Sequence, residues 1–157
     1  MDINLGIAHI DDFKDINLIV KEGHDEHSDA LPHIFSMVDQ VMPESYFKEL
    51  MEDPNIDILV AKIGTDVVGY AVMELHESPS FKSMTRRIFA YMNDFGVKNS
   101  YQRKGIGSTL FEACVVWSQN RGASSLDLTV WEFNKKAITF YESCAMEKLS
   151  SKMTLRL

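Results

Sequence analysis

The stretch Asp94–Ala113, with the sequence DFGVKNSYQRKGIGSTLFEA, constrains the fold more than any other part of the chain. β-Branched and aromatic residues predict a strand that ends near Val97, and regular apolar spacing predicts a helix from Ile106 onward. The turn between them contains two glycines and two cations, and it leads into a helix whose first N–H groups have no internal partner. Because glycine lets a ligand approach the backbone and the helix dipole favours negative charge, this turn predicts a pyrophosphate-binding site.

Two other phosphate motifs fit the turn less well. A Walker loop requires G-x-x-x-x-G-K-[ST], which occurs nowhere in the chain, and a dinucleotide fingerprint requires a third glycine where Leu110 stands. The sequence therefore disfavours a nucleotide hydrolase or a dehydrogenase. A turn that uses glycine only for steric reasons is the alternative to phosphate binding.

Hydrophobic periodicity along the rest of the chain alternates between strand-like and helix-like segments. Strands are expected at residues 3–7, 56–63, 67–75, 88–97 and 126–130, with a hairpin turn at 64–66 and one or two closing strands within 148–157. Helices are expected at residues 10–20, 31–40, 43–51, 106–121 and 134–144, with a polar break at 24–29. This order favours an α/β or α+β fold in which helices cover both faces of one sheet.

Length and composition are those of one folded domain, expected to span residues 1–157. Hydrophobic residues make up 45% of the chain, and the net charge of -7 disfavours a nucleic-acid binder because phosphate backbones are bound by clustered Lys and Arg. The chain does not begin with a basic region and an apolar run, and no stretch approaches the roughly 18 apolar residues of a membrane span. We therefore expect a cytoplasmic protein with no membrane partner.

The cysteines and histidines indicate neither a disulfide nor a metal site. Cys114 and Cys144 each lie in an apolar pattern without a CxxC partner, so both are expected to be reduced. Segment 22–29, EGHDEHSD, and His33 contain metal-ligand side chains, but a polar break between helices explains them without a metal. This acidic segment is expected to be a solvated loop, or else to attract a cationic acceptor.

Together with a second segment, the turn resembles the GNAT superfamily of acetyl-CoA-dependent N-acetyltransferases. Gln102, Gly105 and Gly107 match the three defining positions of that family's Q/R-x-x-G-x-G/A motif. The segment 134–146, NKKAITFYESCAM, is similar to the family's second cofactor segment, in which an Asn opens a helix that ends in a Phe-Tyr pair. One departure is the Ala-Met pair at 145–146, where Gly-Phe is common.

The resemblance implies a mixed, mostly antiparallel central sheet of six to seven strands with helices on both faces. It also implies transfer of an acetyl group from acetyl-CoA to a primary amine of a small molecule. The implied cofactor-binding residues come from the strand end that meets the pantetheine arm, from the turn, and from the start of the later helix: Phe95, Gly96, Val97, Gln102, Arg103, Lys104, Gly105, Ile106, Gly107, Ser108 and Asn134. Asn134 is equally suited to be the N-cap of its own helix.

The implied reaction needs no enzyme nucleophile, because the amine attacks directly. It needs a proton acceptor, since an alkylammonium with a pKa of about 10.4 is only about one part in a few thousand neutral near pH 7. Asp94, Asn93 through an ordered water, and Glu74 are the candidates; strand alternation places Asn93 and Asp94 on opposite faces without showing which points inward. Tyr141 occupies the position of the family's thiolate-protonating tyrosine, although a tyrosine on a helix face also serves for packing.

Two other functions stay open at this level. One is a cofactor-binding regulatory module without turnover, and the other is acetylation of a protein N-terminus, lysine or peptide amine. The acceptor and the length of the acyl group are also open, as is a homodimer.

Overall fold

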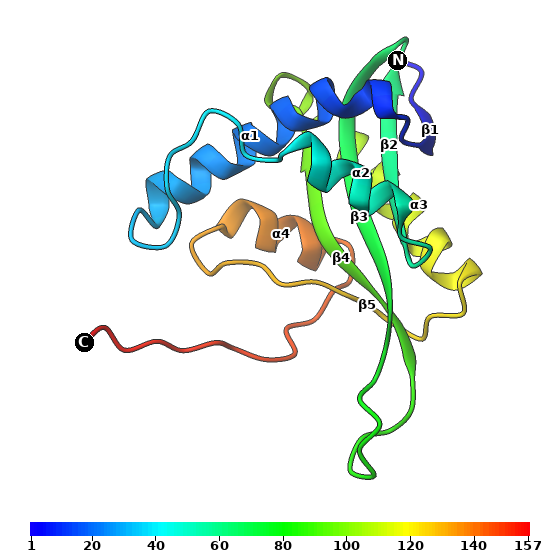
Figure 1. Ribbon diagram of the computed structural model, residues 1–157, viewed down its shortest axis with the longest axis vertical. Coiled ribbons are helices and arrows are strands. Elements are labelled where there is room, and N and C mark those ends of the chain that lie inside the picture. The colour runs from blue at the N-terminus through cyan, green and yellow to red at the C-terminus, as the bar shows by residue number, and fades with distance from the viewer.

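A five-stranded mixed sheet forms the centre of the fold in the computed structural model, which describes residues 1–157 (Figure 1). The strands stand in chain order across the sheet: β1 (Asn4–Ile7), β2 (Ile56–Ile63), β3 (Asp66–Glu77), β4 (Ile88–Val97) and β5 (Leu126–Asp127). The first four are antiparallel to their neighbours, and β5 is parallel to β4. The expected mixed, mostly antiparallel sheet is therefore confirmed.

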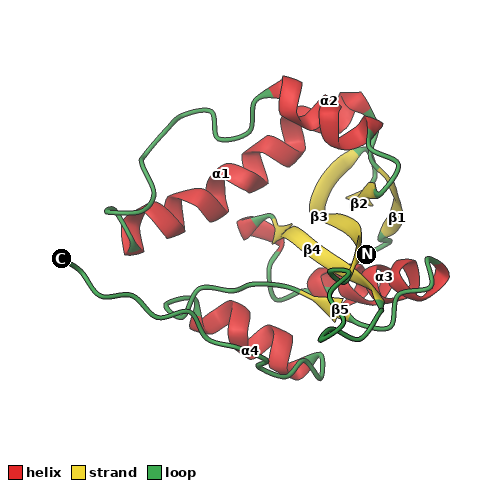
Figure 2. Cartoon of the chain, turned by 60° about the horizontal axis from the view of Figure 1, so that its bottom comes forward, coloured by secondary structure: helices red, strands yellow, loops and turns green.

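Helices cover both faces of this sheet, as the sequence predicts (Figure 2). The helices are α1 (Phe13–Ala30), α2 (Glu44–Glu52), α3 (Ile106–Asn120) and α4 (Lys135–Ser143), with single 3-10 turns at η1 (Ile10–Asp12) and η2 (Asn99–Tyr101). Helices α1 and α2 lie on one side, and α3 and α4 lie on the other. Because successive strand residues point to opposite faces, Val60 and Val72 join the α1–α2 core while Ala61 and Ala71 join the α3 core.

The pairing of β3 with β4 contains an irregularity that shapes the later site. Val72 pairs with Asp94, but the next residue of β3, Met73, pairs with Met92. Asn93 is therefore an extra residue on β4 with no partner on β3, which is the arrangement of a β-bulge. A bulge interrupts the alternation of side chains between the two faces of a strand.

Helix α1 differs from the expected short helix with a polar break at 24–29. It continues without interruption to Ala30. The polar residues are compatible with a helix because Lys21 and Asp25 form an i, i+4 ion pair at 3.1 Å and the Ser28 hydroxyl donates to the Asp25 carbonyl at 3.1 Å. Conversely, residues 31–40 are not the expected helix: they return along α1, where the Phe35 ring packs edge-on against His24 and His27.

The carboxyl-terminal end also differs from the expectation. The sheet has five strands instead of six or seven, and residues 148–157 form no strand. Instead, this segment extends away from the body of the molecule (Figure 1). Just before it, Ala145 adopts a positive φ of 67°, a conformation that glycine adopts more readily, and the Met146 N–H donates to the Tyr141 carbonyl.

No helix of the structure combines the length and the apolar content that crossing a membrane requires.

Candidate functional site

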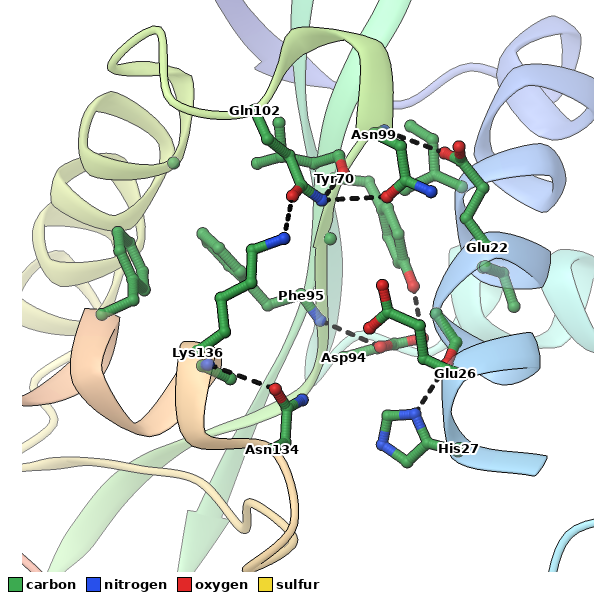
Figure 3. Close-up of a pocket in the computed structure, with 18 of the residues that line it drawn as sticks. Glu22, Glu26, His27, Tyr70, Asp94, Phe95, Asn99, Gln102, Asn134 and Lys136 are labelled. Carbon is green, nitrogen blue, oxygen red and sulfur yellow. Dashed lines mark hydrogen bonds between the residues drawn. The ribbon is translucent and has the colours of Figure 1, made fainter. Parts of the chain in front are cut away.

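A cavity of about 710 Å³ opens where β4 and β5 separate. The two strands pair only at Ala90 with Leu126 and Tyr91 with Asp127, so the rest of β4 has no strand beside it on that side. Side chains from α1, β4, the start of α3 and α4 line the cavity, as Figure 3 shows for those drawn there. The parallel pairing therefore ends early enough to leave room for a ligand inside the fold.

One end of this cavity is formed by the turn at residues 103–108, which we call the cradle. The backbone N–H groups of residues 103–108 hydrogen-bond to no other group of the protein. Two left-handed residues, Arg103 with φ 64° and Gly105 with φ 83°, turn the chain so that these groups lead into the first turn of α3. Successive free N–H groups at a helix start bind phosphate oxygens, and the predicted phosphate turn thus has the geometry that such a site needs.

The two glycines of the motif are required for different reasons. A Cβ on Gly105 would meet no atom within 4 Å, so this position needs glycine for its backbone conformation. A Cβ on Gly107 would come within 3.3 Å of the Phe140 ring, so this position lets α3 approach α4 closely. The sequence predicts ligand access at both positions, and the structure adds a packing role at Gly107.

Gln102 anchors the cradle to the end of β4. Its side-chain amide donates to the Val97 carbonyl and to Asn99 Oδ1, both at 3.0 Å. Its side-chain oxygen accepts from Lys136 Nζ, a residue at the start of α4 that the sequence reasoning missed. Gln102 thus lines the cavity while it also fixes the shape of the turn.

The cations near the cradle divide into two groups. Arg103 and Lys136 line the cavity, where a positive charge would face bound phosphates. Lys104 lies over the Tyr101 ring, 5.3 Å from its centroid, and does not line the cavity. Ile106 is fully buried in the α3 core, so only its backbone is available to a ligand.

The bulge on β4 brings both Asn93 and Asp94 to the cavity, although simple alternation predicts opposite faces. Asp94 Oδ2 accepts the Tyr70 hydroxyl at 2.5 Å, and Oδ1 accepts the Phe95 N–H at 3.0 Å. Burial raises the pKa of Asp94, while the hydrogen bonds from Tyr70 and Phe95 oppose that rise. Tyr70, which no signal in the sequence singles out, therefore positions this carboxylate.

Tyr141 lies on α4 against the rings of Phe95, Phe111 and Phe140 and lines the cavity. Its hydroxyl hydrogen-bonds to no other group of the protein. Burial, followed by the nearby charge of Asp94, raises its pKa well above the usual tyrosine value. The phenol consequently keeps its proton at neutral pH.

Helix α1 forms the opposite wall, and Glu22, Glu26 and His27 are among the side chains that it contributes (Figure 3). Glu22 Oε1 also accepts the Asn99 N–H at 3.1 Å, which ties α1 to the chain just before the cradle. The i, i+4 spacing of Glu22 and Glu26 is visible in the sequence, but the expected break in the helix conceals that they share a face.

The His27 ring is fixed in one orientation within this wall. Its Nδ1 donates to the Gly23 carbonyl, 2.7 Å away, because a carbonyl oxygen can only accept. In the neutral ring this leaves Nε2 as a proton acceptor. The rings of Phe35 and Phe133 pack edge-on against His27 and hold it in place.

Two other candidates from the sequence are engaged in local contacts. Glu74 bonds to His76 Nε2 at 2.5 Å and to Asn93 Nδ2 at 3.4 Å, and it does not line the cavity. Asn134 lines the cavity and its side chain accepts the Ala137 N–H at 3.2 Å, so it is the N-cap of α4. No three His, Cys, Asp or Glu side chains lie close enough together to hold a metal ion.

The fold and the cavity are compatible with an acyl transferase, and the family comparison identifies the chain as one. The chain belongs to the acetyltransferase (GNAT) family, whose model matches residues 21–146, a range that includes the cradle and Tyr141. The protein is therefore an N-acetyltransferase, and membership of the family implies the use of acetyl-CoA.

Relatives of known sequence are distant. An uncharacterized N-acetyltransferase of Bacillus subtilis is 27% identical over 105 residues, which are 67% of this chain and 68% of that protein. Thialysine N-epsilon-acetyltransferase of Sus scrofa is 29% identical over 107 residues, which are 63% of this chain and 60% of that enzyme. The chain thus matches about three fifths of the length of the pig enzyme.

Solved structures extend the similarity to the whole fold. A mutant of the BH1408 protein from Bacillus halodurans is 25% identical with a TM-score of 0.94, and the match covers 100% of this chain and 99% of that one. An aminoglycoside acetyltransferase from an uncultured soil metagenomic sample, solved with sisomicin, is 18% identical with a TM-score of 0.72 over 99% of this chain and 96% of that one. These similarities confirm the GNAT-like α+β fold.

Proposed function

We propose that residues 1–157 act as one domain that acetylates a primary amine of a small molecule by direct attack. One observation carries this proposal: a single cavity joins the anion cradle at residues 103–108 to Asp94 and Tyr141. The cradle suits a phosphate-bearing donor, and the two side chains suit the proton transfers that amine acetylation requires.

Acetyl-CoA fits the residues at the cradle end. The free N–H groups of residues 103–108 would bind its pyrophosphate, with Arg103 and Lys136 supplying positive charge. The unpaired side of β4 at Phe95 and Val97 would bind the pantetheine arm, with Asn134 nearby on the cavity wall. When bound, the cosubstrate supplies an acetyl thioester as the electrophile.

The α1 side of the cavity suits a cationic acceptor. Glu22 and Glu26 place carboxylates on this wall, and Asp94 lies at the bulge. The rings of Phe35 and Trp131, which pack edge-on with centroids 5.3 Å apart, also line it and offer apolar faces to an alkyl chain or an ammonium. Two of the similar proteins are a thialysine N-epsilon-acetyltransferase and an aminoglycoside acetyltransferase, which supports a small amine as the acceptor.

Proton transfers are assigned to groups on both sides of the reacting centre. Asp94 accepts the proton of the ammonium, either directly or through a water held by Asn93, because burial has made it a stronger base than an ordinary aspartate. Tyr141 donates its proton to the departing thiolate.

The proposal is tested by release of free thiol from acetyl-CoA in the presence of polyamines, lysine analogues, aminoglycosides, and peptides with a free N-terminus or a lysine. Turnover with a small amine that Tyr141→Phe slows while acetyl-CoA still binds would support it. Turnover with peptides alone would instead indicate a protein acetyltransferase. Tight acetyl-CoA binding without thiol release from any acceptor class would favour a regulatory module and contradict the proposal.

A further inference from the structure

Asn93 lines the cavity with a side chain that can offer either of two opposite groups. Its carboxamide presents the NH₂ group, which donates hydrogen bonds, or, after rotation by a half turn, the oxygen, which accepts them. An alkylammonium carries only N–H donors, so it is bound by the oxygen and repelled by the NH₂ group. The end of Asn93 that faces the cavity therefore decides whether this residue helps or hinders the binding of an amine.

Glu74 determines this orientation from outside the cavity. Its Oε2 lies 3.4 Å from Asn93 Nδ2, and Glu74 itself does not line the cavity. A carboxylate can only accept hydrogen bonds, so the end of Asn93 that faces Glu74 has to be the NH₂ group. The Oδ1 atom accepts no hydrogen bond from the protein, and it is left as the free end of a side chain that lines the cavity.

The Glu74 carboxylate is itself held in place by His76. The Nε2 atom of His76 lies 2.5 Å from the same carboxylate oxygen, Oε2, and must donate to it. The His76 ring stacks on Phe89 with centroids 5.4 Å apart, and the Arg87 guanidinium lies over the Phe89 ring, 4.3 Å from its centroid. Because two donors converge on Oε2, the atom at this position has to be a hydrogen-bond acceptor.

We propose that Glu74 is a positioning residue for the acceptor amine. It holds Asn93 with Oδ1 toward the cavity, where this oxygen accepts a hydrogen bond from the ammonium or from the water through which the proton reaches Asp94. Glu74 does not line the cavity, so it acts on the amine through Asn93 and not by contact. The inference rests on the proposed amine acetylation, and it makes Asn93 a residue that binds the acceptor amine.

The test compares variants of Glu74 by their kcat/KM for the acceptor amine at saturating acetyl-CoA. Glu74→Met removes the hydrogen-bond acceptor and keeps a side chain of similar length, and it should lower kcat/KM by about three- to tenfold. Glu74→Gln removes the charge but keeps an oxygen that can accept from both His76 and Asn93, so it should restore most of that loss. If Glu74→Gln is as slow as Glu74→Met, the charge of Glu74 acts on the amine directly and the proposal is wrong.

Two controls separate positioning from a general loss of structure. Glu77→Met makes the same replacement on the same strand, at a position that does not line the cavity, and should leave kcat/KM near the wild-type value. All of these variants should keep the wild-type affinity for acetyl-CoA in calorimetry. In a double-mutant cycle, Glu74→Met should have no further effect once Asn93→Ala has removed the carboxamide. An equal loss with and without Asn93 would show that Glu74 does not act through it, which also overturns the proposal.

The orientation of Asn93 can also be measured without turnover. The side-chain NH₂ signal of Asn93, identified in an NMR spectrum by its absence in Asn93→Asp, should shift upfield in Glu74→Met, which lacks the hydrogen bond, and return in Glu74→Gln. If amines are acetylated but the signal of Glu74→Met is unchanged, the positioning role alone is wrong. If no amine is acetylated, the proposed function is wrong, and the role of Asn93 in binding the amine is overturned with it, whatever the signal shows.

Discussion

Gly96 is the position where the structure predicts the largest effect from the smallest change. It pairs with Tyr70 across β3 and β4, and a Cβ added there would lie 2.8 Å from Tyr70 Cε1 and 2.9 Å from Ile19 Cγ2. Tyr70 is 2% exposed and Ile19 is 3% exposed, so neither side chain has free space to move into. The Tyr70 hydroxyl is also held by Asp94 at 2.5 Å.

The expected cost of Gly96→Ala follows from these contacts. Overpacking of a filled core costs about 1–3 kcal/mol. If Tyr70 moves far enough to break its hydrogen bond to the carboxylate, a further loss of about 1.5–3 kcal/mol is expected. For a chain of this size each kcal/mol lowers Tm by about 2–4 °C, so overpacking alone should lower Tm by about 2–12 °C. The acetylation rate should fall as well, because Tyr70 positions Asp94.

Urea unfolding and calorimetry of Gly96→Ala measure this cost, with Gly6→Ala as the matched control. Gly6 also lies in a strand, but a Cβ there meets no atom within 4 Å. Adding Ile19→Ala removes one of the two contacted atoms and should restore part of the stability lost by Gly96→Ala. A change in unfolding free energy below about 0.5 kcal/mol for Gly96→Ala, no larger than that of Gly6→Ala, would refute the packing argument.

Three further predictions concern the site. Tyr141→Phe should lower kcat, measured by steady-state kinetics, by about 10²- to 10⁴-fold and leave the acetyl-CoA Kd, measured by calorimetry, nearly unchanged. If turnover and acetyl-CoA affinity fall by the same factor, Tyr141 is not the general acid. Burial raises the pKa of Asp94 in the folded state, so the stability that Asp94 contributes is full below its ordinary pKa of about 3.9 and is lost as pH rises through its folded-state pKa. Asp94→Asn should abolish this part of the pH dependence of the unfolding free energy, measured by urea titration at several pH values. In the wild type, the acid limb of the kcat/KM profile should lie above the usual aspartate range. Gly105→Ala should lower the free energy of unfolding by about 1–2 kcal/mol, because Gly105 has a φ of 83°, and it should weaken acetyl-CoA binding. Gly122→Ala is the control: with a φ of 77° at the far end of α3 it carries the same strain, and acetyl-CoA binding measured by calorimetry should stay unchanged.

Local sequence determined the features whose physics is local. The glycine turn, the strand before it and the amphipathic helix after it are all predictable, because periodicity and free helix N–H groups depend on residues close together in the chain. The family resemblance rests on these same residues and is confirmed. The predicted break in α1 at 24–29 is wrong. Hydrophobic spacing disappears there because the helix turns a charged face to the cavity. Ion pairs such as Lys21 with Asp25 still support the helix.

Tertiary structure alone decided where the chemistry lies. Both Asn93 and Asp94 reach the cavity because of the bulge between β3 and β4. The register between two strands is set by packing over the whole sheet, and neither strand's own sequence determines it. Tyr70 reaches Asp94 only through that pairing. The sequence also predicts one or two closing strands within 148–157, but the structure has none there. Whether a strand forms depends on an edge that accepts it, and that edge is a property of the assembled sheet.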